Sequence, residues 1–587
     1  MSQFFKSVFA SCLGVILAFI ALGFILMGIG ASMGGDKGKS LGDSGILRLD
    51  FEHPFPEETN NVNTGMFGSE AIMNVGLTEF CKLISAAKTD SKIKGILINS
   101  NSNGNGFAST QKIIEALTDF KTSGKFIYSY ADFYSQSAYI VSSVADSVMM
   151  NPNGEIDLKG YSITYPFFKG LFDKIGVKFE IFYAGNFKSA TEPFRRTDMS
   201  PENKEQSREF LADMLDITFK ELENNRKLSK EDVSRAMVTL SGKKADTALA
   251  SRLIDKSCYW DEVLSILRKK ANLSDSKSMD FVELMDYSHS TTKEESGTFG
   301  KDKIALVYAE GDVAYSNNTK GNINDEKYLK IFDKIRNDKK VKAVVLRVNS
   351  GGGSALTSDI IWREIELIKA QGIPVIASFG DYAASGGYYI ACGADTIVAM
   401  ESTLTGSIGV FSMMPNVKKL MNEKLGISFD TVRTHLDAIQ LSAVQEMSAN
   451  EKLRLQKSTD DIYAQFLDRV AKGRKMEKSE VHKYAQGRIW SGRRAKEIGL
   501  VDVLGNLDDA IAIAATKAKL GTDYRVSEYP KIKESIFEQL IREFIANSEK
   551  EDESVKILTN EYKRLKAYKQ WMDSEGIQAR IPVRFEF

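Results

Sequence analysis

Ser385 has the surroundings that best suit nucleophilic chemistry in this sequence. It lies in the stretch Asp381–Ala391, DYAASGGYYIA, which follows the apolar, β-branched run Ile373–Phe379. The run predicts a buried strand and the residues after it predict a short helix, so Ser385 falls at a helix N-terminus. A hydroxyl at that position meets unpaired backbone amides and the positive end of the helix dipole, which stabilise an oxyanion. The alternative interpretation is a tight Ser-Gly-Gly turn that serves packing alone.

A nucleophilic serine requires a base within hydrogen-bond reach, and histidine is the usual one. The chain has four histidines: His53, His289, His435 and His482. His435 is the best placed of them, because it follows a predicted strand over Ser428–Arg433. No carboxylate pattern frames it as a Ser-His-Asp triad requires, and ordinary solvated histidines explain all four.

Lysine is the alternative base, provided that burial lowers its pKa toward neutrality. Lys188 lies among small and aromatic residues in the stretch Tyr183–Phe194, YAGNFKSATEPF, directly after a predicted strand over Phe179–Tyr183. A solvated surface lysine is the other interpretation of this residue.

The two halves of the chain are copies of each other. The match holds at one offset of 249 positions, as from Asp146 to Asp395, and so long a period indicates a duplicated domain. At this offset Ser385 corresponds to Gln136, so the first copy builds the scaffold without the nucleophile. Conversely, the second copy has no lysine at the place of Lys188. Serine and lysine therefore occur in opposite copies, which predicts one composite site for each pair of copies.

Both halves alternate apolar strands with longer helical stretches, the pattern of an α/β fold. Strands are predicted at residues 46–51, 93–99, 126–131, 304–308, 341–348 and 373–379, helices at 78–87, 204–223 and 328–336, and turns at 100–106 and 349–354. A polar stretch over residues 288–302 predicts an inter-domain linker. The predicted domains are a membrane anchor and linker (1–45), an N-terminal repeat with the lysine (46–290), a C-terminal repeat with the serine (300–525) and a helical tail (526–587).

The N-terminal run Val8–Gly30 carries no charge and is long enough to cross a bilayer. A cleaved signal peptide has a shorter apolar core and a small-residue cleavage site, so the run favours an uncleaved anchor. Lys6 precedes the span while Lys37 and Lys39 follow it, so the flanking charges do not decide its orientation. The formal net charge of the chain is +0, which gives no reason to expect a nucleic-acid partner.

The four cysteines are Cys12, Cys81, Cys258 and Cys392. They are far apart, without metal-ligand spacing, and so we expect buried free thiols. A bond between Cys81 and Cys258 is the alternative that the sequence leaves open.

Four separated motifs resemble the signal peptide peptidase A family, also called protease IV, in its long tandem-repeat form. They are NSGGGS (Asn349–Ser354), ASGGY (Ala384–Tyr388), LTGSIG (Leu404–Gly409) and FKSATEPF (Phe187–Phe194). The similarity runs from about Ile46 to Ala510, and one departure is Gly351, where the family usually has proline.

This resemblance implies two tandem ClpP/crotonase-like domains after one transmembrane helix, and a serine peptidase with a Ser/Lys dyad of Ser385 and Lys188. It implies an oxyanion hole from the amides of Gly352 or Gly353 and of Gly386. It also implies that Ser407 orients Lys188, and the first copy has Leu158 at the place of Ser407. The sequence leaves open whether Lys188 meets Ser385 within one chain or across two.

The resemblance further implies the setting of the enzyme: the bacterial inner membrane, with the catalytic domains facing the periplasm or outside, as a homo-oligomer, a tetramer in the family. The expected substrates are short apolar peptides such as remnant signal peptides, because small residues around Ser385 let a substrate strand approach closely. No cofactor, metal or nucleic acid is implied. Two other functions are considered, a crotonase-type acyl-CoA enzyme, which needs no nucleophilic serine, and an inactive membrane scaffold of the same fold.

Overall fold

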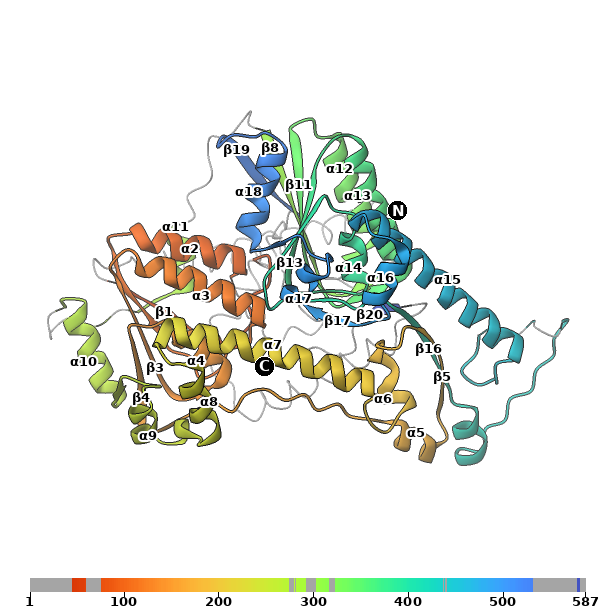
Figure 1. Ribbon diagram of the computed structural model, residues 1–587, viewed down its shortest axis with the longest axis horizontal. Helices are drawn as coiled ribbons and strands as arrows, with labels where there is room; N and C mark the ends of the chain where they lie inside the picture. The colour runs from red at the N-terminus through yellow and green to blue at the C-terminus, as the bar shows by residue number, and fades with distance from the viewer. Residues whose placement is uncertain are drawn as a thin grey trace, which may run out of the picture.

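The computed structural model describes residues 45–59, 75–273, 279, 281–291, 302–315, 323–435, 438, 441–530 and 578–580 of the chain. The predicted anchor Val8–Gly30 and most of the predicted tail lie outside these residues. Within the described ranges, the structure contains no helix with the length and apolarity needed to span a bilayer. Figure 1 shows one α/β unit at the lower left in orange and yellow and a second in green and blue above it.

The first unit is built on a six-stranded sheet of order β6-β4-β3-β2-β1-β7, in which every pairing is parallel. Its strands are β1 (Gly45–Leu49), β2 (Ile93–Ile98), β3 (Phe126–Ser135), β4 (Ser147–Asp157), β6 (Lys256–Ser257) and β7 (Phe281–Glu283). Alternate residues of β1 face opposite layers: Ile46 packs with α10 (Trp260–Lys270), and Leu47 packs with α2 (Leu77–Thr89) and α3 (Phe107–Lys121). Both faces are covered, which explains why the strands are apolar throughout.

The second unit has a sheet of order β17-β15-β13-β11-β8-β19, with β14 and β18 continuing beside β13. Its strands are β8 (Asp302–Glu310), β11 (Val341–Ser350), β13 (Val375–Ala384), β14 (Thr396–Ala399), β15 (Leu404–Gly406), β17 (Ile489–Ser491), β18 (Val503–Leu504) and β19 (Tyr524–Tyr529). Helices α12 (Asp325–Asn337), α13 (Ala355–Ala370) and α15 (Ala449–Arg474) cover one face, and α18 (Leu507–Lys517) covers the other. The sheet is parallel except where β17 joins β15.

The predicted duplication agrees with the order of elements in the two units. Strands β3 and β13 have equal length, start 249 positions apart, and each leads into a short helix, α4 (Gln136–Ser142) or α14 (Gly386–Ala391). The 26-residue helices α7 (Pro201–Arg226) and α15 start 248 positions apart. The other helices are α5 (Lys169–Ile175), α6 (Glu192–Arg195), α8 (Lys230–Val238), α9 (Ala245–Ala250), α11 (Leu284–Thr291), α16 (Lys478–Tyr484) and α17 (Gly492–Glu497).

A third sheet, of order β10-β9-β12-β20-β16-β5, combines strands from both halves of the chain. Its members are β5 (Lys178–Ala184), β9 (Val313–Ala314), β10 (Ile323–Asn324), β12 (Gly352–Ser354), β16 (Val410–Asn416) and β20 (Gln578–Arg580). The first half contributes β5, which pairs antiparallel with the whole of β16, from Val410↔Ala184 to Asn416↔Lys178. Figure 1 shows β5 and β16 running together away from the second unit. The two halves are therefore joined by main-chain pairing.

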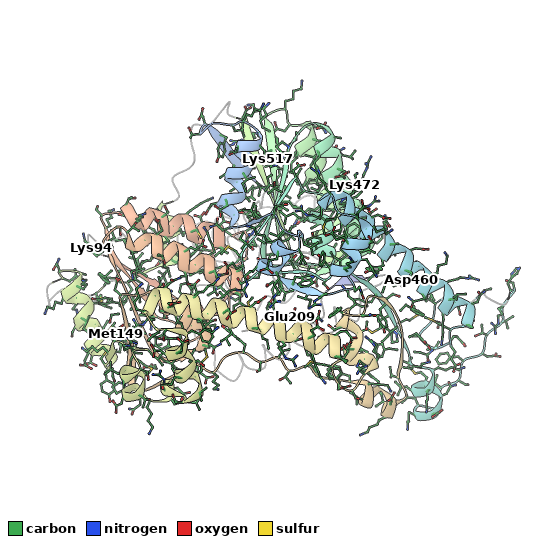
Figure 2. All side chains as sticks on the ribbon, viewed as in Figure 1. Lys94, Met149, Glu209, Asp460, Lys472 and Lys517 are labelled. Atoms are coloured by element: carbon green, nitrogen blue, oxygen red, sulfur yellow. The ribbon has the colours of Figure 1, made fainter. Side chains whose placement is uncertain are left out.

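Helix α7 holds the first unit against the second through a buried carboxylate. Asp213 is 1 % exposed and accepts hydrogen bonds from Ser491 Oγ (2.6 Å), Arg493 Nη2 (2.5 Å) and Arg494 Nε (2.7 Å). One turn earlier, Glu209 accepts from Arg488 Nη2 at 2.7 Å (labelled on α7 in Figure 2). These bonds fix α7 to the segment that contains β17.

A second buried contact joins the units on the side of α3. The Asp381 carboxylate of β13 accepts from Ser109 N (2.9 Å) and Ser109 Oγ (2.6 Å) in the first turn of α3, and burial raises its pKa. Nearby, Arg347 of β11 forms a two-pronged ion pair with Glu57, with Nε to Oε2 at 2.9 Å and Nη2 to Oε1 at 3.0 Å. Arg347 is 5 % exposed and Glu57 2 %, so this pair lies in the interior.

Three sequence-based expectations about local structure need correction. The predicted strand over Ser428–Arg433 is wrong, since these exposed residues have no regular structure and no paired strand. The predicted linker begins too early, because α11 continues through Thr291. The open alternative of a Cys81–Cys258 disulfide is excluded, because both thiols are free, as is that of Cys392.

Replacing Arg347 with methionine tests how strongly the buried ion pair holds the units together. Arg347→Met leaves the Glu57 carboxylate buried without its cation, and we expect a loss of about 3–5 kcal/mol in the free energy of unfolding. The exposed pair of Arg48 with Glu283, 41 % and 44 % exposed, offers a matched control, and Arg48→Met should cost about 0–1 kcal/mol. Urea unfolding followed by fluorescence measures both, and equal midpoints would contradict the expectation.

Candidate functional site

Ser385 lies, as predicted, at the junction of β13 and α14, in a strained backbone conformation. It is the residue before the first turn of α14, with φ 58° and ψ −118°, and it has no exposed surface. Its amide donates to Gly406 O at 2.8 Å, while its carbonyl accepts from Tyr389 N at 2.9 Å. A positive φ is costly for a residue with a Cβ and persists where the surroundings impose it, which is common at functional sites.

Lys188 reaches Ser385 from the other half of the chain. It follows β5 and precedes a 3₁₀ turn over Ser189–Thr191. Its Nζ lies 2.8 Å from Ser385 Oγ, 3.1 Å from Ser407 Oγ and 3.1 Å from Ser407 O. Three of the six predicted site residues are thus in hydrogen-bond contact, and the contact forms within one chain.

The amino group of Lys188 is enclosed completely. Lys188 is 0 % exposed, and burial lowers its pKa well below the ordinary value of 10.5. Removing an ammonium from water is unfavourable, and the oxygens that contact Nζ are neutral, so the neutral amine is favoured. A neutral amine can accept the proton of a hydroxyl 2.8 Å away.

The turn that contains Ser407 is also strained and buried. Ser407 has φ 48° and is 1 % exposed, directly after β15. Its amide donates to Arg488 O at 2.7 Å, which fixes the turn against the segment before β17. This position presents both oxygens of Ser407 to Lys188.

The predicted oxyanion-hole glycines lie on two elements. Gly352 and Gly353 belong to β12, and Gly386 is the first residue of α14. The amide of Gly352 donates to Ser350 Oγ at 3.2 Å, so it is already engaged within its own loop. A first-turn amide such as that of Gly386 has no acceptor within its helix.

Gln206 of α7 is a supporting residue that the sequence did not reveal. It is 3 % exposed, and its Nε2 donates to Phe187 O (3.2 Å) and Ser189 Oγ (3.1 Å), on either side of Lys188. Its Oε1 accepts from Ile489 N at 3.1 Å. In the sequence this residue is one polar position of an amphipathic helix, so no local signal distinguishes it.

A glycine allows the Lys188 loop to approach the second unit. Gly487 has φ 79°, and a Cβ placed there would lie 2.6 Å from Lys188 Cβ. Its amide donates to Ile408 O at 2.8 Å, beside Ser407. The segment around Gly487 is therefore sandwiched between the lysine loop and the Ser407 turn.

The three histidines whose side chains the structure describes take no part in this arrangement. His435 is exposed and its Nδ1 contacts Thr434 Oγ1 at 3.1 Å, whereas His482 Nδ1 contacts Tyr463 OH at 3.1 Å. His53 is exposed, near the start of the described chain. Within the described residues, the structure supports lysine rather than histidine as the neighbour of Ser385.

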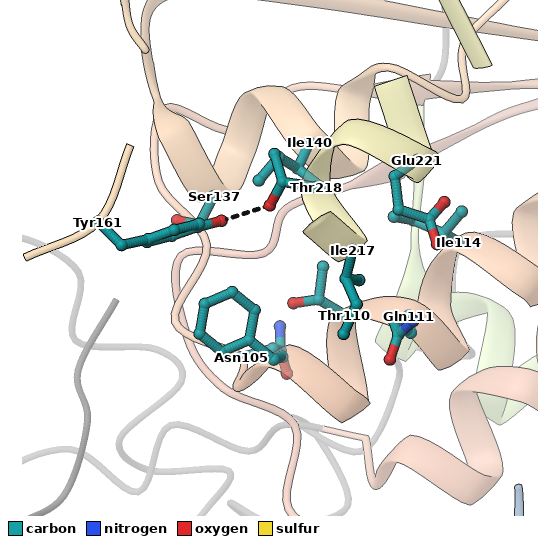
Figure 3. Close-up of a pocket in the computed structure, with 11 residues that line it drawn as sticks. Asn105, Thr110, Gln111, Ile114, Ser137, Ile140, Tyr161, Ile217, Thr218 and Glu221 are labelled. Carbon is teal, nitrogen blue, oxygen red and sulfur yellow. Dashed lines mark hydrogen bonds between the residues drawn. The ribbon is translucent and has the colours of Figure 1, made fainter. Parts of the chain in front are cut away.

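A hollow in the first unit lies near the counterpart of the Ser385 junction (Figure 3). It is lined by Asn105, Phe107, Thr110, Gln111, Ile114, Ser137, Ile140, Tyr161, Ile217, Thr218 and Glu221. Ser137 stands where the second copy has Gly386, and Tyr161 OH is hydrogen-bonded to Thr218 Oγ1 at 2.7 Å. None of these lining residues is a lysine, histidine or cysteine, so the hollow does not repeat the pairing of a serine with a lysine.

A protein-family comparison matches this chain twice. The model of peptidase family S49 covers residues 119–274 and 368–521, more than half of the sequence. The two matches begin 249 positions apart, as the duplication requires. The second match includes Ser385, Gly386 and Ser407, and the first includes Lys188.

Several named relatives are similar to this chain over most of its length. Protease 4 of Salmonella typhi is 33% identical over 521 residues, 86% of this chain and 83% of that protein. Protease 4 of Haemophilus influenzae is 32% identical, covering 88% and 86%. The chloroplastic serine protease SPPA of Arabidopsis thaliana is 32% identical, covering 75% and 65%. Among solved structures, a ClpP1 mutant from Listeria monocytogenes has a TM-score of 0.24 at 15% identity, covering 35% of this chain and 94% of that one, too weak a likeness to assign the fold.

The burial of Lys188 predicts a specific dependence of stability on pH. Between the lowered pKa of Lys188 and 10.5, the unfolded chain binds a proton that the folded protein does not, so stability falls as the pH falls through this range. Lys188→Met removes this proton uptake. We therefore expect Lys188→Met to become more stable relative to the original chain as the pH is lowered from about 10.5. The quantity to compare is the difference between the free energies of unfolding of the two proteins. Parallel curves from urea unfolding at several pH values would contradict a lowered pKa.

Proposed function

Because the chain belongs to peptidase family S49 and is a serine peptidase, we propose that Ser385 is its nucleophile and Lys188 its general base. One observation carries the proposal: two side chains without exposed surface, from opposite copies, lie 2.8 Å apart. Such a contact is the geometry that activates a serine hydroxyl.

The proposed reaction proceeds through an acyl-enzyme. Neutral Lys188 accepts the proton of Ser385 Oγ as that oxygen bonds to the substrate carbonyl carbon, and the resulting ammonium passes the proton to the departing amine. A water then attacks the ester, giving its proton to Lys188, and the carboxylic product leaves as Ser385 regains its hydrogen. Ser407 supports this role, since its oxygens hold Nζ beside Ser385 in both steps.

The negative charge on the tetrahedral intermediate requires donors that are oriented in advance. We assign this function to the amide of Gly386 at the N-terminus of α14 and to that of Gly353 on β12. The engagement of Gly352 N by Ser350 Oγ favours Gly353 over Gly352.

We propose short, apolar, unfolded peptides as substrates, with remnant signal peptides at the membrane as the natural class. Ser385 has no exposed surface, so a folded domain cannot reach it, and its neighbours along the chain, Ala383, Ala384 and Tyr388, are buried small or aromatic residues. Comparing kcat/KM for labelled peptides of equal length tests this, and equal values for apolar and charged sequences would contradict it.

We further propose that Val8–Gly30 anchors the chain in a bacterial cytoplasmic membrane, with both repeats outside it. The support is the uncharged apolar run and the similarity to the Protease 4 proteins. Membrane sedimentation of the full chain, compared with a chain that starts at Gly45, tests the anchor. Protection of the repeats from added protease in intact spheroplasts would contradict the orientation.

Exposed apolar side chains support assembly into a homo-oligomer, for which we propose a tetramer. Leu425, Ile427 and Val432 are 57 %, 47 % and 100 % exposed on the segment after β16, and Leu171 of the neighbouring α5 is 53 % exposed. Exposed apolar side chains that lie near one another are typical of protein interfaces. Sedimentation velocity of the original chain and of the Val432→Asp variant tests this assembly. A monomer in both samples would contradict it.

Substitution of each proposed catalytic residue should remove activity without unfolding the protein. We expect Ser385→Ala and Lys188→Ala each to lower kcat by about three orders of magnitude or more, because the two side chains act as a unit. His435→Ala and His482→Ala serve as controls for a histidine base and should retain activity. Peptide hydrolysis by the purified variants measures this, and substantial turnover by Lys188→Ala would reject the lysine base.

The pH dependence of activity should report the same lysine. Only the neutral amine accepts a proton, so kcat/KM should rise as the pH increases through the lowered pKa of Lys188 and stay high in mild alkali. A histidine base would instead reach its plateau near pH 7, at about its ordinary pKa. A plateau near neutrality that His435→Ala abolishes would overturn the assignment.

A further inference from the structure

A connector of four residues, Ala485–Arg488, joins α16 to β17 and has an unusual backbone. Gln486 has φ 54° and Gly487 has φ 79°, so two consecutive residues lie in the left-handed region. This conformation is unfavourable for glutamine, which has a Cβ, and it persists where the surroundings impose it. The contacts of the connector therefore hold it in place, and they lead to two segments of the candidate active site.

On one side the connector contacts the loop that carries Lys188. The carbonyl of Gln486 accepts from Phe187 N at 2.9 Å, directly before Lys188 in the chain. The approach is close, since a Cβ on Gly185 would lie 2.3 Å from that same carbonyl oxygen. A change in the backbone of Gln486 would therefore move the residues next to the lysine.

On the other side the connector holds the turn that contains Ser407. The amide of Gly487 donates to Ile408 O at 2.8 Å, and the carbonyl of Arg488 accepts from Ser407 N at 2.7 Å. Lys188 Nζ contacts both oxygens of Ser407 at 3.1 Å. The connector thus fixes the relative position of the two segments that meet in these contacts.

A tyrosine of α15 holds the connector in this conformation. Three of the four connector amides donate to main-chain carbonyls, whereas that of Gln486 donates to the hydroxyl oxygen of Tyr463 at 3.1 Å. Tyr463 is 9 % exposed and packs in the core of the second unit, where α16 lies against α15 (Figure 1). Its hydroxyl also contacts Nδ1 of the exposed His482 at 3.1 Å. A buried side chain is therefore bonded to the strained residue itself.

We propose that Tyr463 is a positioning residue for the catalytic lysine, because its hydroxyl holds the strained backbone of Gln486 and so the spacing between the Lys188 loop and the Ser407 turn. This rests on the proposed function in one respect, namely that Lys188 is the base. Without the hydroxyl, the partly buried amide of Gln486 has no acceptor, and its backbone relaxes away from Phe187. Burial raises the pKa of Tyr463 to about 12, so the hydroxyl keeps its hydrogen at neutral pH and in mild alkali.

Tyr463→Phe removes the hydroxyl and keeps the ring, so the packing of the core is preserved. We expect kcat for an apolar peptide to fall about 10- to 100-fold, since displacing a catalytic group by about 1 Å has an effect of this size. KM should stay within about twofold, because the loss falls on proton transfer. The lowered pKa of Lys188 depends on complete enclosure, so the rise of kcat/KM with pH should move to higher pH in this variant.

Two further variants serve as controls. Tyr328→Phe removes another buried tyrosine hydroxyl of the second unit, which donates to Tyr308 O at 2.6 Å. His482→Ala removes the second partner of the Tyr463 hydroxyl and leaves the bond from Gln486 N. Both controls should keep the kcat and the pH profile of the original chain. A Tyr463→Phe protein with unchanged kcat, or an equal loss in either control, would overturn the proposal.

Hydrogen–deuterium exchange tests the connector without catalysis. In Tyr463→Phe, exchange should become faster in peptides that contain Phe187–Ser189 and Gln486–Arg488, with β3 as an unaffected reference. Unchanged exchange in the lysine loop would contradict the proposed link. Exchange raised throughout the protein would show a general loss of stability and would also count against a positioning role.

The result is separable from the catalytic proposal. If Lys188→Ala were to retain hydrolysis, the catalytic pair would fail, while the exchange measurement would still show whether Tyr463 holds the lysine loop. If Lys188→Ala were inactive and Tyr463→Phe fully active, the positioning role would be wrong and the catalytic pair would stand.

Discussion

The enclosure of one amino group depends on how the two halves of the chain are arranged. Lys188 has no exposed surface, and its Nζ contacts neutral oxygens of Ser385 and Ser407. Such burial favours the neutral amine only where water is excluded on every side. Neither copy builds that enclosure alone: the first supplies the lysine loop and α7, and the second supplies the turns at Ser385 and Ser407. Main-chain pairing of β5 with β16 brings these parts together.

Duplication makes this division of roles possible, and the first copy shows what replaced the nucleophile. Gln136 stands at the Ser385 position, and its Oε1 accepts from Lys159 N (3.0 Å) and Gly160 N (2.8 Å). Gln136 is the first residue of α4 and has no positive φ, and the preceding Ser135 caps that helix, in contrast to the φ of 58° at Ser385. The same strand-to-helix junction is therefore relaxed where it only supports structure and strained where it presents a hydroxyl.

Local patterns were sufficient to predict the central strands of the two parallel sheets, and they failed where pairing partners decide. Apolar β-branched runs predicted β11 and β13, because a strand buried on both faces is apolar along its whole length. The run Ser428–Arg433 contains the β-branched residues Thr431 and Val432, but it lies exposed without a neighbouring strand. Strand β20 had no signal at all, since three residues are too few for a periodicity and its partners are more than 160 positions away. A strand is stable only through its neighbours, and the sequence of a single segment does not reveal which strands these are.

The sequence by itself determined the two copies and the placement of Ser385 before a helix. It also showed that one copy lacks the serine and the other lacks the lysine, which pointed to Lys188. These follow from periodicity, residue size and an internal comparison, all of which are local or repeated information. Only the tertiary structure decided that Lys188 contacts Ser385 within one chain, and that Gln206 and the pair of Arg347 with Glu57 support the arrangement. The residues of the two pairs are 197 and 290 positions apart. Their side chains are ordinary polar positions in the sequence, and their function arises from the packing of whole units, which brings them out of water together.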